Sequence, residues 1–218
     1  MSHRMLRILC GFVVLWALVA CGPGTPTPSQ DLPSLIQEAR VALDANKPDE
    51  AISKLQQALK LDPNSVEAHF LLGNAYAKKE QFAQAEEQFL QALKLDEKNT
   101  DARSNLGVVY YRQGKLQEAE KAFRAALAQQ PNDAEIHYNL GGVLITMNKV
   151  EDALAEFLKA KELNPSLPES YLGLGSAYKL QGKRPEAVEA LRKYLELSGD
   201  PSGRQIAEQL LQEMGEKP

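Results

Sequence analysis

The chain has 218 residues, of which 44% are hydrophobic and 25% are charged, and its formal net charge is −4. This size and composition are typical of one medium-sized folded domain and unlike those of a disordered chain. Nucleic-acid binders carry a basic stripe or patch, so a pI of about 5.5 argues against a nucleic-acid partner.

Residues 1–20 predict a signal peptide. Arg4 and Arg7 give a positive start, and the uncharged run over 8–20 is short for a membrane span, which needs about 20 apolar residues. The run ends in Leu18-Val19-Ala20-Cys21, which resembles the bacterial lipobox. That resemblance implies that Cys21 becomes the new N-terminus and carries fatty acyl chains such as palmitate, at least two of which hold a protein stably on a membrane. The alternative is an ordinary signal peptide with an incidental cysteine.

Residues 21–31 predict a tether, because Gly22 to Gln30 is polar and rich in Pro and Thr. Fully extended at about 3.1 Å per residue, it reaches roughly 28 Å, so we expect the folded part to lie close to the membrane. The residue after Cys21 is Gly22, not the Asp that favours retention at the inner membrane in many bacteria with two membranes. The expected address is therefore the periplasmic side of the outer membrane, with the outer face of the cytoplasmic membrane as the alternative.

A unit then recurs along the chain at a fixed interval, the one that separates Gly73 from Gly107, and this period indicates stacked supersecondary units. Within 100–133, apolar residues at helical spacing predict two helices, and Gly114 between them suits a left-handed helix end. The residues that recur at one phase are Gly73, Gly107, Gly141 and Gly175; Ala85, Ala119, Ala153 and Ala187; and Phe89, Phe123 and Phe157.

The repeated glycines predict close packing of the two helices. A glycine costs about 1 kcal/mol relative to alanine in a helix interior, so glycines at one phase imply a packing reason. We expect each glycine to face the repeated alanine, as Gly107 would face Ala119, and Phe123 to fill the gap to the neighbouring unit. Capping pairs that begin the first helices are expected at Asn64 with Glu67, Asn132 with Glu135, and Ser166 with Glu169.

On these residues the chain resembles the tetratricopeptide repeat family. The family's spacing is clearest in one copy, at Leu106, Gly107, Tyr110, Ala119, Phe123, Ala126 and Pro131. The resemblance implies an all-α solenoid, a right-handed superhelix of antiparallel helix pairs with about five repeats and a C-terminal capping helix. The expected divisions are 32–65, where the copy is degenerate, then 66–99, 100–133, 134–167 and 168–200, followed by a capping helix at 201–214.

The capping helix is expected to begin at Asp200 as N-cap, with Pro201 at its first position, and to end at Gly215. Its apolar residues fall at spacing four, which places Ile206, Leu210 and Met214 together on one face.

No catalytic, cofactor-binding or metal-binding motif occurs, so the sequence predicts a protein that is not an enzyme. His69 and His137 share a phase and are interpreted as packing or rim residues, with a metal ligand as the alternative. Gly173-Leu174-Gly175 resembles a nucleotide-binding loop, but its repeat phase within a helix explains it better. Four acids in the first helical turns, which suit capping and could alternatively contact a ligand, are Glu67, Asp101, Glu135 and Glu169.

The family resemblance also implies a concave groove lined by the first helix of each repeat. Rings can bury apolar side chains and amides can satisfy an extended backbone, so the groove predicts peptide capture. Asn105 and Asn139 share a phase and resemble the asparagine ladder of some members; contact with neighbouring loops is the alternative. In some members, Lys and Arg at particular groove positions bind the C-terminal carboxylate of a chaperone. Those positions lack Lys and Arg here, which argues against such a clamp. The expected groove residues are Phe70, Asn74, Lys78, Ser104, Asn105, Val108, Tyr111, Arg112, Tyr138, Asn139, Ile145, Leu172, Ser176 and Lys179.

The predicted function is a lipid-anchored scaffold that mediates protein–protein interactions in the bacterial cell envelope. By resemblance, two finer functions stay open: a pilotin-like assembly factor for a type IV pilus or secretion machine, and an adaptor subunit of an envelope enzyme such as a peptidoglycan hydrolase or protease. A carbohydrate-binding module is a third alternative, which rests on Tyr111 and Tyr138 alone.

Overall fold

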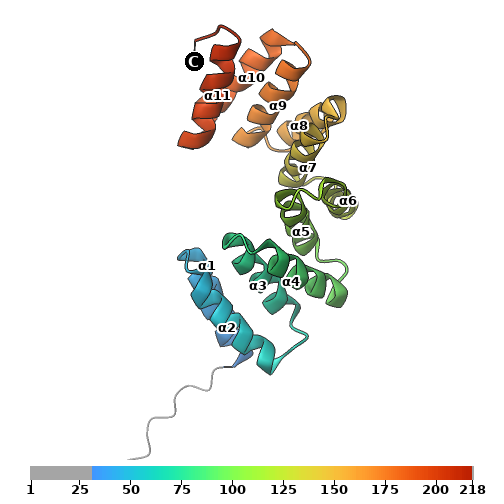
Figure 1. The fold of residues 1–218 in the computed structure, drawn as a ribbon, viewed down its shortest axis with the longest axis vertical. Coiled ribbons are helices and arrows are strands. Elements are labelled where there is room, and N and C mark those ends of the chain that lie inside the picture. The colour runs from blue at the N-terminus through green and yellow to red at the C-terminus, as the bar shows by residue number, and fades with distance from the viewer. Residues whose placement is uncertain (1–30, 218) are drawn as a thin grey trace, which may run out of the picture. The chain divides into compact units, whose positions relative to one another are not determined.

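The computed structural model describes residues 31–217, which form eleven α-helices and no strand (Figure 1). The predicted signal peptide, the predicted acylation site Cys21 and residues 22–30 of the predicted tether lie outside the described residues. None of the helices in this range is both long and apolar enough to cross a bilayer. The helices are α1 (Leu32–Asp44), α2 (Pro48–Leu61), α3 (Val66–Lys78), α4 (Phe82–Leu95), α5 (Thr100–Arg112), α6 (Leu116–Leu127), α7 (Ala134–Thr146), α8 (Val150–Leu163), α9 (Pro168–Leu180), α10 (Arg184–Leu197) and α11 (Pro201–Glu213).

The helices stack as an all-α solenoid of five pairs with α11 at the end, as the repeat pattern predicts (Figure 1). Each odd-numbered helix packs on the even-numbered helix that follows it and on the odd-numbered helix of the next pair. Each even-numbered helix packs on the odd-numbered helices before and after it, and within residues 31–217 it contacts no other even-numbered helix. The odd-numbered helices therefore form a continuous inner layer, and the outer layer is divided by grooves.

The mid-helix glycines pack most closely against large side chains of the second helix, and at Gly175 the predicted alanine also lies near, since a Cβ there would be 3.5 Å from the backbone oxygen of Ala187. A Cβ on Gly107 would lie 2.9 Å from the ring of Phe123, and one on Gly141 would lie 2.6 Å from the ring of Phe157. The repeated alanines of the second helices are fully buried. The physical reason is that the ring occupies the volume that a Cβ would take, so the glycine makes room for a ring.

The expected role of the phenylalanines as fillers between units is confirmed at Phe157. A Cβ on Gly173 of the next pair would lie 2.5 Å from the same ring that fills the space at Gly141. The ring is thus held between glycines of two successive helix pairs. Gly173 and Gly175 both lie inside α9, so their spacing serves helix packing.

The helix caps lie one residue later than predicted. Ser65, Asn99 and Asp133 accept hydrogen bonds from the backbone N–H groups at Ala68, Ala102 and Ile136, at 3.2, 2.9 and 3.0 Å. The predicted caps Asn64, Asn132 and Ser166 lie earlier, within the turns before α3, α7 and α9. At Asn64 the reason is visible, because its N–H donates to the Asp62 carboxylate at 2.9 Å and so continues the turn.

The turn inside each pair contains a residue in the left-handed conformation. Gly114 has a φ of 75°, as predicted. The residue at the same position of every other pair is also left-handed. It is a glycine at Gly182 and a non-glycine residue at Asn46, Glu80 and Asn148.

The final helix α11 has Asp200 as its N-cap and is followed by the left-handed Gly215, as predicted, but its buried face differs from the prediction. Gly203, Ala207 and Leu211 are buried, whereas Ile206 is 50% exposed. Gly203 sets this face, because a Cβ there would collide with the hydroxyl of the buried Tyr194. Leu210 and Met214 pack at the edge of the same cluster.

Candidate interaction groove

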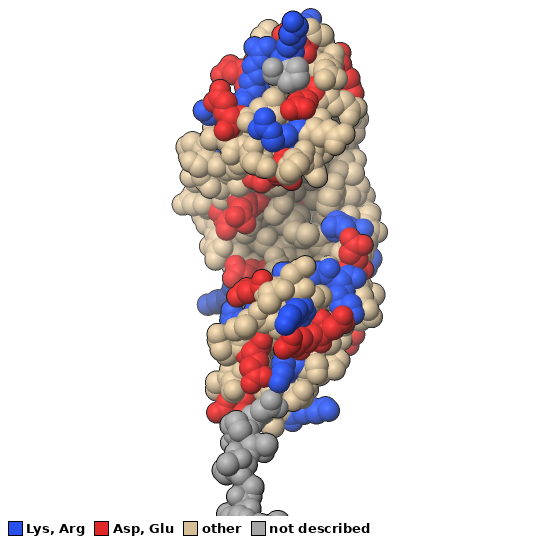
Figure 2. Space-filling view, turned by 90° about the vertical axis from the view of Figure 1, so that its left-hand side faces the viewer, with Lys and Arg blue, Asp and Glu red and all other residues tan. Residues whose placement is uncertain are grey.

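The inner layer contains a cavity of about 680 Å³, lined mainly by residues of α1, α3 and α5. Six predicted groove residues line it: Phe70, Asn74, Lys78, Asn105, Val108 and Arg112. A smaller cavity of about 120 Å³ lies between α5 and α7, where Val108, Tyr111, Tyr138 and Asn139 line it together with Gly142. Because Val108 belongs to both, the two cavities adjoin. Figure 2 shows a hollowed surface with few charged residues at the height of the middle helices.

The remaining predicted groove residues, Ser104, Ile145, Leu172, Ser176 and Lys179, line neither cavity. Ser176 donates its hydroxyl to the backbone oxygen of Leu172 at 3.0 Å, and Lys179 forms an ion pair with Glu213 that joins α9 to α11. Ile145 and Leu172 are half-buried against core side chains. The cavities therefore gather the predicted residues of α3, those of α5 except Ser104, and those of the first part of α7. The predicted residues nearer the C-terminus make internal contacts.

The two asparagines at the centre of the larger cavity are bonded to each other. The Asn105 amide donates from Nδ2 to Oδ1 of Asn74 at 2.7 Å. This bond uses one donor hydrogen of Asn105 and one acceptor of Asn74, which leaves the amide nitrogen of Asn74 and the amide oxygen of Asn105. The pair can thus offer both a donor and an acceptor to an extended backbone.

The cations of the larger cavity are held by internal partners. Lys78 donates from Nζ to the backbone oxygen of Leu43 at 3.0 Å, at the C-terminal end of α1. Arg112 pairs with Glu80 at 2.7 Å and lies over the ring of Phe82, 5.1 Å from its centroid. Each cation thus has one internal hydrogen-bond partner and keeps further donor hydrogens, so amides, rings and these two cations line the groove together.

The apolar part of the groove is partly exposed to solvent. Val108 is 38% exposed and Tyr111 is 39% exposed. The ring of Tyr138 packs on Phe157, with centroids 5.9 Å apart, and burial, supported by the nearby Glu169 carboxylate, raises the pKa of Tyr138. The Tyr138 hydroxyl therefore stays neutral near pH 7. Apolar side chains of a ligand could bury the exposed parts of Val108 and Tyr111.

Several further residues line the larger cavity and were not among the predicted groove residues, including Arg40, Asp44 and Phe82. Arg40 lies one full repeat before Asn74, and Asp44 lies one full repeat before Lys78, so the period extended into the degenerate first copy would have found both. Phe82 begins a second helix, and the first-helix pattern carries no signal for it.

The histidines His69 and His137 lie outside these cavities and hold turns. His137 contacts the backbone oxygen of Pro131 through Nε2 at 3.0 Å and Glu156 through Nδ1 at 2.6 Å. His69 repeats this arrangement with Pro63 and Gln88, at 3.1 and 2.8 Å. Over residues 31–217, no group of three or more potential metal ligands comes together.

The chain belongs to the tetratricopeptide repeat family, whose model matches residues 36–100, 72–134, 104–168 and 138–204. Proteins of this family bind protein or peptide partners and are in general scaffolds, not enzymes. A comparison with curated protein sequences finds no match.

Several solved structures share the fold. MamA is 29% identical, with 72% of this chain and 92% of that chain covered and a TM-score of 0.66. YrrB, described as a TPR protein with an unusual peptide-binding site, is 25% identical, with 84% and 94% covered and a TM-score of 0.65. The Pseudomonas aeruginosa protein pilF is 23% identical, with 84% of each chain covered and a TM-score of 0.75, which shows the fold alone.

Proposed function

We propose that this chain is a lipid-anchored scaffold of the bacterial cell envelope that captures a segment of a partner protein in its inner groove. The observation that carries the proposal is the pair of adjoining cavities on the inner helices, with the bonded amides of Asn74 and Asn105 beside the exposed Val108 and Tyr111. Amides can hold the partner's backbone while rings bury its side chains. The peptide-binding site named for YrrB is consistent with this use of the fold.

The proposed address rests on the sequence before residue 31. Leu18-Val19-Ala20-Cys21 supports acylation at Cys21, and the following Gly22 favours the periplasmic side of the outer membrane. Two or more acyl chains would hold the repeats at the membrane surface, within reach of an envelope assembly.

Capture by the groove can be tested by recovering bound proteins from membranes that contain the chain with Cys21 intact. The double variant Asn105→Ala, Tyr111→Ala should lose the specific partner, with an unchanged helical circular dichroism signal. The control variant Leu90→Ala, Leu158→Ala removes two exposed side chains of outer helices, 44% and 37% exposed, and should retain the partner. Retention by the groove variant would place the binding surface elsewhere.

The identity of the captured protein separates the finer functions. A secretin or another pilus or secretion component would support an assembly factor, and a peptidoglycan hydrolase or protease would support an adaptor subunit. The anchor has its own test: the Cys21→Ser variant should leave the detergent-rich phase in a phase-separation experiment. Recovery of that variant with the lipids would contradict acylation at Cys21.

A further inference from the structure

The outer groove between α8 and α10 differs from the two grooves before it, because within residues 31–217 it lacks the ion pair that crosses each of them. Lys115, just before α6, pairs with Glu86 of α4 at 2.8 Å, and Lys149, just before α8, pairs with Glu120 of α6 at 2.7 Å. The next lysine in phase is Lys183, but the position one full repeat after Glu120 is Leu154. Lys183 instead lies over the ring of Tyr178, 5.9 Å from its centroid.

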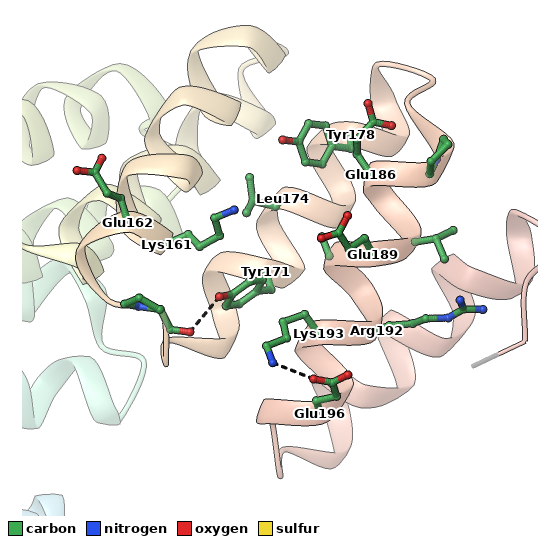
Figure 3. Close-up of a pocket in the computed structure, with 14 residues that line it drawn as sticks. Lys161, Glu162, Tyr171, Leu174, Tyr178, Glu186, Glu189, Arg192, Lys193 and Glu196 are labelled. Atoms are coloured by element: carbon green, nitrogen blue, oxygen red, sulfur yellow. Dashed lines mark hydrogen bonds and ion pairs between the residues drawn. The ribbon is translucent and has the colours of Figure 1, made fainter.

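A second substitution enlarges the same groove. At this phase α4 and α8 carry Gln88 and Glu156, which bond the histidines, whereas α6 and α10 carry the small Ala122 and Ala190, and in α10 this adds to the loss of the ion pair. Tyr171 replaces the histidine and donates its hydroxyl to the backbone oxygen of Pro165 at 3.0 Å. The result is a cavity of about 910 Å³ between α8 and α10, with α9 beneath it (Figure 3). This volume is at the upper end of the range of ligand pockets.

The walls of this outer groove carry opposite charges that lack ion-pair partners among residues 31–217. Lys193 pairs with Glu196 at 2.9 Å, so these charges neutralise each other. Glu186 and Glu189 on α10 and Lys161 on α8 also line the cavity, and none of the three forms an ion pair within the described range. Figure 3 shows Lys161 and Glu189 pointing into the space over Leu174 from opposite sides.

We infer that this outer groove docks a peptide segment of a second partner protein, one that carries a basic residue, an apolar centre and an acidic residue in sequence. The basic residue would lie against Glu186 and Glu189, and the acidic residue against Lys161. The apolar centre would rest mainly on the half-buried Tyr171 and Tyr178, because Leu174 between them is only 2% exposed. The argument is charge complementarity in a formed cavity, since charged groups at the rim of an interface select the partner and its orientation. The inference stands apart from the proposed inner groove and gives the scaffold a second binding surface.

The test uses fluorescence anisotropy with the full chain and a labelled synthetic peptide of two lysines, three leucines and two aspartates, in that order. We expect binding that weakens with added salt, because exposed charges are screened. The variant Glu186→Gln, Glu189→Gln should weaken binding about tenfold or more, as roughly 1.4 kcal/mol corresponds to tenfold. The repeat supplies a matched control, Glu118→Gln with Glu87→Gln, whose positions are in phase with Glu186 and Glu189 and exposed on α6 and α4.

A charge exchange gives a second readout. Lys161→Glu should weaken binding of this peptide and strengthen binding of one with lysines at both ends. The inner-groove variant Asn105→Ala, Tyr111→Ala should bind the peptide as the unaltered chain does. Absence of binding, equal weakening by the matched control, or loss of binding in the inner-groove variant would overturn the inference. The first two results leave the proposed inner groove untouched, and the third would assign this peptide to it.

Discussion

At the scale of single residues, the decisive feature is the contact between a helix glycine and a ring. Gly141 is buried against Phe157, whereas its neighbour Gly142 has no atom within 4 Å of where a Cβ would lie. Both are glycines inside α7, yet only the first makes room for another side chain. The pair therefore separates the packing role of a glycine from its intrinsic cost to a helix.

Substitution of these neighbours by alanine should have opposite effects on the free energy of unfolding. Gly141→Ala should destabilise the chain by about 1–3 kcal/mol, because the new Cβ overpacks the interface. Gly142→Ala should stabilise it by roughly 0.5–1 kcal/mol, because alanine is the better helix former. Chemical denaturation followed by circular dichroism measures both. Equal effects of the same sign would contradict the packing role of Gly141.

Truncation of the ring itself should be more costly. Phe123 is 1% exposed and its ring lies against Gly107. Phe123→Ala should lower the free energy of unfolding by roughly 3–5 kcal/mol, because it leaves a cavity between two helices. Leu90→Ala, at a 44% exposed position on α4, is the control and should change stability little. A loss below about 1 kcal/mol at Phe123 would show that the ring is not needed in the core.

The sequence identified which residues matter at this scale better than it identified their partners. The fixed period shows that Gly107 and Phe123 recur, but it does not show toward which residue a side chain leans. The caps were misplaced for a related reason: Asn132 and Asp133 are adjacent and both suit an N-cap, so only the backbone decides between them.

At the scale of whole elements, α6 is linked to α8 through one carboxylate. Glu120 accepts from Lys149 at 2.7 Å and from Arg124 at 2.9 Å, and its side chain is 17% exposed. The hydrogen bond from Lys149 lowers the pKa of Glu120, against the opposing effect of its partial burial, and Arg124 assists. The lowered pKa means that the folded chain favours the charged carboxylate more than the unfolded chain does.

This linkage predicts how stability depends on pH. The contribution of Glu120 is fully present above the unfolded pKa of a glutamate, about 4.3, and is lost as the pH falls through the lower pKa of the folded state. Glu120→Gln should therefore be less stable by roughly 1 kcal/mol near pH 7 and should match the unaltered chain in strong acid. Urea denaturation at several pH values gives the comparison. A constant difference between the two chains at all pH values would contradict the linkage.

The helices themselves were largely predictable, since apolar spacing, turn glycines and prolines recur in phase. The exception is the buried face of α11, which has no later repeat to confirm its phase. There the apolar spacing favoured Ile206, whereas the collision that a Cβ on Gly203 would make with Tyr194 turns Ala207 and Leu211 inward. That contact joins two helices and is not visible in the pattern of either one.

At the scale of the whole described domain, a continuous inner layer and a divided outer layer give two kinds of surface. The family resemblance placed the groove on the first helices, and the two inner cavities gather the predicted residues from Phe70 to Asn139 except Ser104. The sequence alone could not exclude Lys179 from the predicted groove, because Lys179 forms its ion pair with Glu213, which lies outside the repeats. The outer groove was not predicted, because it arises where Leu154 replaces the glutamate of the two earlier copies and where α10 carries the small Ala190.

The most direct measurement of the central claim is site-specific photo-crosslinking in cells that make the full chain. A photoreactive amino acid at Tyr111, which lines the inner groove, should form a discrete adduct with one partner protein. The same group at Leu90, 44% exposed on the outer helix α4, should form none with that partner. An adduct of that partner at Leu90 and none at Tyr111 would contradict capture by the inner groove.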